Sequence, residues 1–456
     1  MKKGCDLEKF EILFKIVYLV HIVSCSTNLL YSTFFTKITT VAVVGMSTLL
    51  LFHRLMHIKL YLKTPYWYLY CFFLISMAAT SVVNVRYGVF SNIKIIIWML
   101  IQFFCLCFFG EERSKESVQK EIKIVVWTIV ILSMIFNAIS ICMLFTFYSK
   151  FRYLTETNSL LIGYAYWGRL YGAYVDPNYA SVFSVVALLS GFYLLISYKD
   201  ELKKTQKWLL LIANVLAFMY ITFSASRTAI VVLSLSLFSF FGQLVYIRKN
   251  NVWKAIMVGI LVGAIAIGGE KLTITAFNGY SNMVSLLSTN ETKVNNKIGR
   301  DEELSGDISN RRFSIWKDAL AISMKNPVFG ISFGNIDSYA EKEMPNAYII
   351  TNDFGVFDAF HNMFFDLAAC QGIVGIISFG AIIISSLIFV NKRRKLLHGE
   401  NMVLWAYLFS SCLTIFCSGF FLSLILYVHN LDTVLFWMLW GYFLWLNNSV
   451  SAELNG

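Results

Sequence analysis

Repeated apolar runs of about 20 residues are the feature that most constrains this chain. An α-helix rises ~1.5 Å per residue, so each run is long enough to cross the hydrocarbon core of a bilayer. Hydrophobic residues make up 57% of the 456 residues and charged residues only 14%, a balance that excludes a soluble globular protein. We therefore predict an all-α polytopic membrane protein with about twelve transmembrane helices.

These spans are predicted to form a single transmembrane domain over residues 1–456. Nine of them precede the one long polar segment, residues 271–360, and three follow it. No internal repeat is apparent, although many transporters are built from repeated halves. The predicted spans are 11–30, 38–58, 66–83, 92–110, 122–147, 178–198, 207–223, 226–247, 252–270, 362–390, 402–427 and 430–447.

Basic residues predict the orientation, because short loops that contain Lys and Arg are retained on the cytoplasmic side. With the N-terminus inside, the inner connectors contain 21 of the 38 Lys and Arg residues. Segment 271–360 has nine Lys and Arg against eleven Asp and Glu, and is predicted to be a large extracytoplasmic loop between helices 9 and 10. Both termini are then cytoplasmic. The net charge of +11 arises mostly from basic residues in the inner connectors, which set the membrane orientation, so no nucleic-acid partner is predicted.

The outer loop divides into two parts. The polar run SNMVSLLSTNETKVNNKIGRDEELSGDISN is predicted to be flexible, whereas RRFSIWKDALAISM predicts a helix with its apolar residues 313, 316, 320 and 324 on one side. Asn326-Pro327 ends this helix, and the glycines of NPVFGISFGN allow a tight reversal. Arg311 and Arg312 stand at its start, where the helix dipole disfavours positive charge. A nearby anion would offset that cost.

Four short motifs are predicted on the outer side of the membrane. RLYGAYVDPNYAS leads into the sixth span, and FSASRTA forms the hairpin between the seventh and eighth. RFSIW is followed by NPVFGISFG in the outer loop, and an HN pair opens the tenth span. The polar residues of interest in these motifs are Arg169, Asn178, Arg227, Arg311, Arg312, His361 and Asn362.

This ordered set resembles the O-antigen polymerase and ligase superfamily, integral-membrane glycosyltransferases that include the Wzy-type polysaccharide polymerases. The resemblance covers residues 169–375 through R-x-x-G-x-x-x-D-P-N, S-R-T-A, R-x-x-x-W with N-P-x-x-G-I-x-F-G, and H-N with G-I-x-G. One departure is Ser332, where the family pattern leads us to expect glycine. The resemblance implies a helical bundle similar to that of GT-C glycosyltransferases.

The same resemblance implies an activity and its partners. Such enzymes transfer a polyprenyl-diphosphate-linked glycan onto a sugar hydroxyl of another lipid-linked repeat unit, with inversion and without a metal or cofactor. Guanidinium groups bind phosphate oxygens bidentately and stabilise the leaving diphosphate, a role carried over to Arg227 and Arg312. His361 is the implied general base. Arg169, Arg311, Asn362 and Asn178 are implied substrate-binding residues.

The residues by themselves also allow structural interpretations. His361 could cap a helix at the interface, and Arg227 or Arg169 could extend its charge from lipid to water. Arg311 could pair with Asp307 or solvate a loop helix. Asp176-Pro177-Asn178 is good capping chemistry, and Trp316 is a packing residue. No metal site is predicted, because His53 and His57 lack a third ligand.

The sequence is compatible with three functions. A polymerase is favoured because the outer loop contains no obvious appendage for a different acceptor, and a ligase would deliver glycan to a lipid core or a protein. A polysaccharide flippase would instead show charges buried in mid-span. The predicted location is the bacterial cytoplasmic membrane, with an extracytoplasmic active site. A flippase and a chain-length regulator are expected partners of a polymerase.

Overall fold

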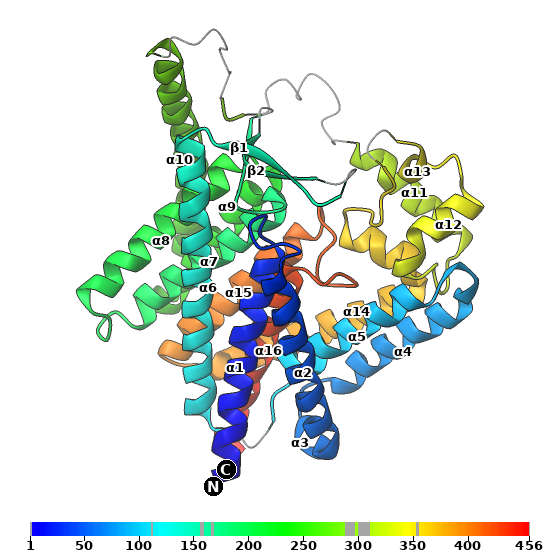
Figure 1. Ribbon diagram of the computed structural model, residues 1–456. Helices are drawn as coiled ribbons and strands as arrows, with labels where there is room; N and C mark the ends of the chain where they lie inside the picture. Colours follow the sequence, from blue (N-terminus) through cyan, green and yellow to red (C-terminus); the bar gives the residue numbers. More distant parts are fainter. Residues whose placement is uncertain are drawn as a thin grey trace. The chain divides into compact units, whose positions relative to one another are not determined.

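The computed structural model describes residues 2–110, 113–155, 159–165, 168–287, 297–299, 311–352 and 355–455. These residues form long helices and one small antiparallel sheet (Figure 1). Asp307, the possible ion-pair partner of Arg311, lies outside the described residues.

Long helices occupy all twelve positions predicted for the spans. Nine of the described helices are long and apolar enough to cross a membrane, and α4 is apolar but has only 17 residues. The chain is therefore a multi-pass membrane protein, while the count of twelve spans stays a prediction. The twelve helices are α1 (Lys2–Cys25), α2 (Phe34–Met56), α4 (Trp67–Val83), α5 (Phe90–Ile101) with the π-helical η2 (Gln102–Cys107), α6 (Lys115–Phe145), α7 (Pro177–Ser197), α8 (Lys204–Phe223), α9 (Arg227–Lys249), α10 (Val252–Leu287), α14 (Met363–Arg393), α15 (Glu400–Ser418) and α16 (Leu431–Asn455).

Shorter elements connect these helices. Four of them, α11 (Arg312–Lys325), η4 (Phe333–Asn335), α12 (Ile336–Glu343) and α13 (Tyr348–Thr351), follow one another in the predicted outer loop. Each is too short to cross a bilayer. The remaining ones are α3 (Ile58–Tyr61), η1 (Val85–Tyr87) and η5 (Arg394–Leu396).

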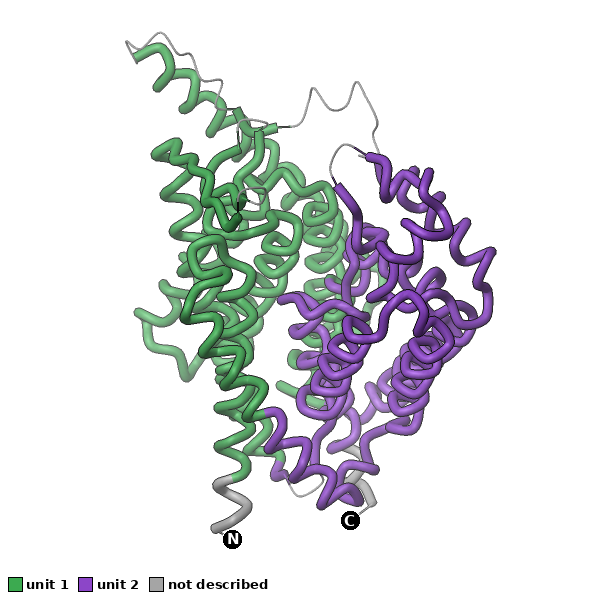
Figure 2. The backbone as a smooth tube through the Cα atoms, turned by 45° about the vertical axis from the view of Figure 1, so that its right-hand side comes forward, with its two compact units in different colours: residues 1–46, 115–304, 398–414 green, residues 47–114, 305–397, 415–456 purple. Residues whose placement is uncertain are grey.

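The chain divides into two compact units, which Figure 2 colours separately. Unit 1 consists of residues 1–46, 115–304 and 398–414, and its main packing pairs are α9 with α10 and α7 with α8. Unit 2 consists of residues 47–114, 305–397 and 415–456, and in it α14 packs against α4, α11 and α16.

A three-stranded antiparallel sheet in unit 1 was not anticipated by the all-helical prediction. Its strands are β1 (Ser149–Tyr153), β2 (Ser159–Ala165) and β3 (Arg169–Gly172), in the order β1-β2-β3. The Asn28 side chain, just after α1, donates to the carbonyls of Leu161 and Tyr174 and so ties this sheet to the helices. The strand β3 carries the first of the predicted site residues.

Two predicted boundaries are wrong. Helix α10 continues through Leu287 rather than ending at residue 270, and its 36 residues correspond to about 54 Å of helix, well beyond the ~30 Å hydrocarbon core. The beginning of the predicted flexible run, residues 281–287, is therefore helical. An α-helix makes its backbone hydrogen bonds within the segment, so α10 can continue beyond the apolar run without a change of structure.

The predicted eleventh span, 402–427, is helical only as far as Ser418. Residues 419–430 form an irregular loop whose segment 422–427 is buried in unit 2. In it, the Tyr427 hydroxyl donates to Gln371 Oε1 at 2.7 Å and the Ile425 carbonyl accepts from Trp437 Nε1 at 2.8 Å. Irregular backbone is tolerated at this depth because protein, and not lipid, surrounds its polar groups. Hydropathy alone cannot distinguish such a loop from a helix.

The predicted helix over RRFSIWKDALAISM is confirmed as α11, and three of the four apolar residues that the spacing aligns on one side do not face the core. Phe313, Leu320 and Met324 are exposed. The buried side consists instead of Ile315 and Ala319, together with Ile322 one turn later. Both sides of the helix are apolar, so periodicity could not decide which one the fold would bury.

Candidate functional site

Arg169 on β3 is a buried arginine that joins two of the predicted motifs. Its side chain is only 7% exposed. Nε donates to the Ser224 carbonyl at 2.9 Å, and Nη2 donates to Asn178 Oδ1 at 2.8 Å. Arg169 therefore connects the loop before α9 to the first turn of α7, all within unit 1.

The start of α7 confirms the capping interpretation of Asp176-Pro177-Asn178. Asp176 is the N-cap, and its Oδ1 accepts from the Asn178 backbone N–H at 2.6 Å, with proline at the first helical position. Asn178 thus contributes its backbone to the cap and its side chain to Arg169. These contacts account for both residues structurally, and the substrate role of Asn178 stays a prediction.

Arg227 is the first residue of α9 and its side chain is exposed. Ser226 is the N-cap, whose hydroxyl accepts from the Ala229 N–H, and Ala225 has a positive φ of 49° that turns the chain sharply out of α8. The same short loop begins with Ser224, which holds Arg169. The buried arginine therefore positions the loop that presents the exposed one.

His361 and Asn362 precede α14 in unit 2. Asn362 is the N-cap: its Oδ1 accepts from the backbone N–H groups of Phe364 and Phe365, and its Nδ2 donates to the Phe420 carbonyl at 2.7 Å. His361 has a φ of 51°, and its ring meets the Phe357 ring edge-on at 5.7 Å between centroids. A histidine in this left-handed conformation is uncommon and is often associated with a functional constraint.

Helix α11 brings Arg312 to the same patch of unit 2 as His361. One turn after Arg312, Trp316 Nε1 donates to the Phe360 carbonyl at 3.2 Å, and its ring stacks on Phe365 at 5.3 Å. The Arg312 guanidinium lies 6.0 Å from the centroid of the Phe421 ring. The packing role of Trp316 is thereby confirmed, and its hydrogen bond places the arginine turn beside the His361 loop.

Arg311 precedes α11, and Asp318 lies in the middle of this helix. Arg311 is exposed and occupies the N-cap position with a φ of 67°. Asp318 Oδ2 accepts from the Ile349 N–H at 3.0 Å and so attaches α13 to α11. Burial raises the pKa of Asp318 above its ordinary value, because desolvation outweighs the opposing effect of that backbone hydrogen bond.

The NPVFGIS segment docks into a break in α14. Ile331 and Ser332 donate their N–H groups to the carbonyls of Ala369 and Cys370, at 3.0 and 2.9 Å. In return, the carbonyls of Pro327 and Val328 accept from Ile373 and Val374. The segment thus replaces the hydrogen bonds that α14 loses where Gly372 leaves the helical conformation, with φ 59° and ψ −154°.

Ser332 occupies the position where the family pattern leads us to expect glycine, and its backbone retains that geometry. Its φ of 67° and ψ of 140° fall in a region that is populated almost only by glycine. Its hydroxyl is buried and has no hydrogen-bond partner. The turn is therefore made at a cost in strain and in one unsatisfied polar group.

We expect Ser332→Gly to stabilise the protein by about 1 kcal/mol, since relief of backbone strain exceeds the extra entropy of glycine in the unfolded chain. The measurement is the midpoint of thermal unfolding in detergent. Ser332→Ala, which removes the hydroxyl but keeps the strain, is the matched control and should give a smaller increase. A midpoint below the parent value for the glycine variant would contradict the strain argument.

Two buried polar residues of α14 that position neighbouring segments were not singled out from the sequence. Asp366 is 2% exposed, and its Oδ1 accepts from the Phe360 N–H at 2.9 Å, which holds the irregular segment leading into His361. Gln371 accepts from Tyr427 and donates to Ser76. A carboxylate and an amide within an apolar span, in the stretches FFD and CQG, were the available signals.

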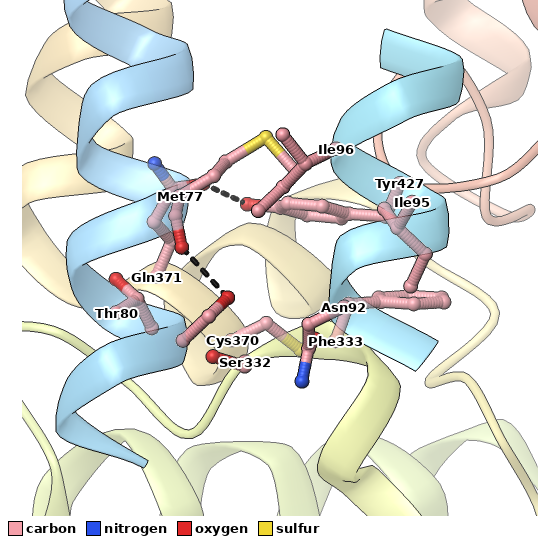
Figure 3. Close-up of a pocket in the computed structure, with 11 residues that line it drawn as sticks. Met77, Thr80, Asn92, Ile95, Ile96, Ser332, Phe333, Cys370, Gln371 and Tyr427 are labelled. Carbon is pink, nitrogen blue, oxygen red and sulfur yellow. Dashed lines mark hydrogen bonds between the residues drawn. The ribbon is translucent and has the colours of Figure 1, made fainter. Parts of the chain in front are cut away.

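Figure 3 shows Gln371 and Tyr427 pointing toward one another beside a narrow crevice that also involves Ser332. The volume of the crevice is about 10 Å³. That is room for about one water molecule and not for a sugar ring. The crevice therefore belongs to the packing of α14 rather than to a substrate site.

Residues 212–380 match a family model described as O-antigen ligase. The matched segment belongs to the O-antigen polymerase and ligase superfamily. This superfamily segment contains five of the seven predicted site residues, while Arg169 and Asn178 precede it. No curated protein matches the chain.

Within the described ranges, no group of three or more His, Cys, Asp and Glu side chains could hold a metal ion. Unit 1 brings Arg169, Asn178 and the loop of Arg227 together. Unit 2 brings Arg312 together with His361 and Asn362. Unit 1 thus offers a buried, hydrogen-bonded guanidinium at Arg169 and an exposed one at Arg227, and in unit 2 the turn that contains Arg312 lies beside the loop of His361.

Proposed function

We propose that this protein is a polysaccharide polymerase of the bacterial cytoplasmic membrane. It transfers a glycan from a polyprenyl diphosphate onto the non-reducing-end hydroxyl of another lipid-linked repeat unit. The observation that carries this proposal is that Arg227 and Arg312 are each the first residue of a helix. The positive end of the helix dipole disfavours a cation there, so each of the two positions is suited to binding an anion that offsets this cost.

A diphosphate has the chemistry that such positions require. A helix N-terminus offers backbone N–H groups, and an arginine adds a planar, permanently charged donor. We propose that both arginines bind the diphosphate of the donor lipid and stabilise the charge that develops on it as it leaves. The bonds from Arg169 to Ser224 favour a positioning role for that residue. Arg311 and Asn362 remain weaker candidates for contacts with the glycan.

The proposed transfer step is a direct displacement at the anomeric carbon. The acceptor oxygen forms a bond to the anomeric carbon of the donor sugar while the bond from that carbon to the diphosphate oxygen breaks. The electron pair of the broken bond stays with the polyprenyl diphosphate, and His361 takes the proton of the acceptor hydroxyl. Attack from the face opposite to the leaving group inverts the anomeric carbon.

The membrane topology supports this proposal. Helices α9 and α10 are consecutive candidate spans, and α11, α12 and α13 are too short to cross. In the proposed topology the start of α9 and the start of α14 therefore face the same, extracytoplasmic, side. A ligase that delivers glycan to a lipid core or a protein is the second candidate, because the matched family model is described as O-antigen ligase.

Reconstitution in vesicles with one purified polyprenyl-diphosphate-linked repeat unit tests the proposal. A ladder of products is the expected result, and release of free polyprenyl diphosphate should accompany each transfer. A single transfer that occurs only when a core lipid or protein acceptor is supplied would favour the ligase. Translocation of an unchanged repeat unit would overturn the enzymatic proposal in favour of a flippase.

The two helix-terminal arginines can be tested with controls on the same helices. We expect Arg227→Gln and Arg312→Gln each to lower the transfer rate about 10²–10³-fold, the usual loss for one preorganised charge-stabilising donor. Arg248→Gln at the far end of α9 and Lys325→Gln at the far end of α11 remove exposed charges of the same kind. Equal losses in all four variants would contradict a specific role for the helix starts.

A further inference from the structure

Helix α11 exposes an apolar stripe that the packing of unit 2 does not use. Phe313, Leu320 and Met324 are 67%, 50% and 76% exposed. Their spacing of seven and four residues aligns them on one side of the helix. The opposite side, at Ile315 and Ala319, is fully buried. Three large apolar side chains exposed in a row indicate a contact with something outside this unit's core.

The stripe continues into the lipid-facing surface of a membrane helix. Val328 and Phe329 follow α11 and are also exposed. The Val328 carbonyl accepts from the Val374 N–H, which fixes this segment against α14. At this level α14 exposes Ile373 and Ile377, which lie on one helical face of a candidate span. An apolar surface therefore runs from the span, across residues 328–329, and onto α11.

The charges of α11 fit the boundary between lipid and water. Residues 311–325 contain four basic residues, Arg311, Arg312, Lys317 and Lys325, against the single acidic residue Asp318. Lys317 is exposed on the edge of the stripe, where its long stem can lie along apolar surface while its ammonium group reaches the water. Basic residues beside an apolar stripe are typical of helices that bind the surface of an anionic bilayer.

We infer that α11 lies in the surface of the outer leaflet, with Phe313, Leu320 and Met324 inserted among the lipids and its basic residues at the level of anionic phospholipid headgroups. The partner is the bilayer itself. The contact places the first turn of α11, and with it Arg312, at headgroup depth. This inference concerns where the helix lies and does not depend on the reaction that the protein catalyses.

Depth-dependent quenching in nanodiscs tests the inference without any measurement of activity. A fluorescent amino acid is incorporated at one position at a time, at Leu320, Met324 or Lys325, into the full chain. The nanodiscs contain phosphatidylcholine and phosphatidylglycerol, with nitroxide-labelled phosphatidylcholine as the lipid quencher and iodide as the aqueous quencher. Lys325 is the matched control, because it is exposed on the same helix but points away from the stripe.

We expect the fluorophores at Leu320 and Met324 to be quenched by the nitroxide lipid at least about twofold more than the one at Lys325, and by iodide at least about twofold less. Nanodiscs of phosphatidylcholine alone should reduce this contrast, because the basic residues lose their anionic partner. Iodide quenching equal to that at Lys325 would place the stripe in water and overturn the inference. Protection from both quenchers would show that another protein surface, such as a second copy, covers the stripe.

Discussion

A protein carrying His361→Asn is expected to insert into the membrane and to bind its lipid-linked substrates, yet to transfer glycan about 10²–10⁴-fold more slowly, the usual contribution of a general base. Asparagine is chosen because it tolerates the positive φ of 51° at this position nearly as well as histidine does, so the backbone is preserved. Its amide cannot accept a proton near pH 7. The measurement is the initial transfer rate at saturating donor in reconstituted vesicles.

Two controls distinguish a loss of catalysis by the imidazole from a structural change in the loop that contains His361. His361→Gly relaxes the left-handed backbone, and added imidazole should restore part of its activity if the ring acts as a base. The thermal unfolding midpoint of His361→Asn should stay close to that of the parent, since asparagine accommodates the positive φ at this position and so keeps the loop conformation. A folded His361→Asn protein with the parent rate would remove this histidine from the mechanism.

Gly372→Ala is expected to cost about 3–5 kcal/mol and to abolish accumulation of folded protein at 37 °C. A Cβ at this position would lie 2.5 Å from the Val328 carbonyl oxygen and 2.6 Å from that of Pro327. The φ of 59° adds backbone strain for any residue with a side chain. Because these two carbonyls accept hydrogen bonds from α14, the clash would also break the docking of the NPVFGIS segment.

Gly380→Ala is the matched control for this prediction. Gly380 lies on the same helix, and a Cβ there would meet nothing within 4 Å. Alanine is the better helix former by about 1 kcal/mol, so this variant should be as stable as the parent or slightly more stable. The comparison is made by the yield of monodisperse protein and by its thermal unfolding midpoint. Similar values for the two variants would contradict the assigned role of the break at Gly372.

Much of the fold could be predicted because apolar runs and basic connectors obey simple rules. Helices occupy each predicted span, and nine of them have the length and apolarity needed to cross. The predictions failed where one amino-acid composition is compatible with two different structures. The run 402–427 is strongly apolar, yet it leaves the helical conformation after Ser418 and residues 422–427 are a buried irregular segment. Helix α11 is apolar on both sides, so its spacing did not indicate which side is buried.

The candidate site shows the same division. The motifs singled out Arg169 and Arg312, but only the structure connects the first to Ser224 and places the second beside the His361 loop. Asp366 and Gln371 were missed because the residues around a polar side chain within a span do not indicate which group it will contact. Those partners, Phe360 N–H and Tyr427, come from the backbone and from a loop distant in sequence.

The amino-acid sequence by itself determined that this chain is a multi-pass membrane protein, and its motifs indicated the superfamily whose family model matches residues 212–380. Both follow from local physics, since crossing a bilayer requires about 20 apolar residues in succession and a motif is a short pattern. Only the tertiary structure decided which face of α11 is buried, that α14 breaks at Gly372 to receive the NPVFGIS segment, and that Arg169 holds the loop of Arg227. Those outcomes depend on contacts between residues far apart in the chain, which no local pattern encodes.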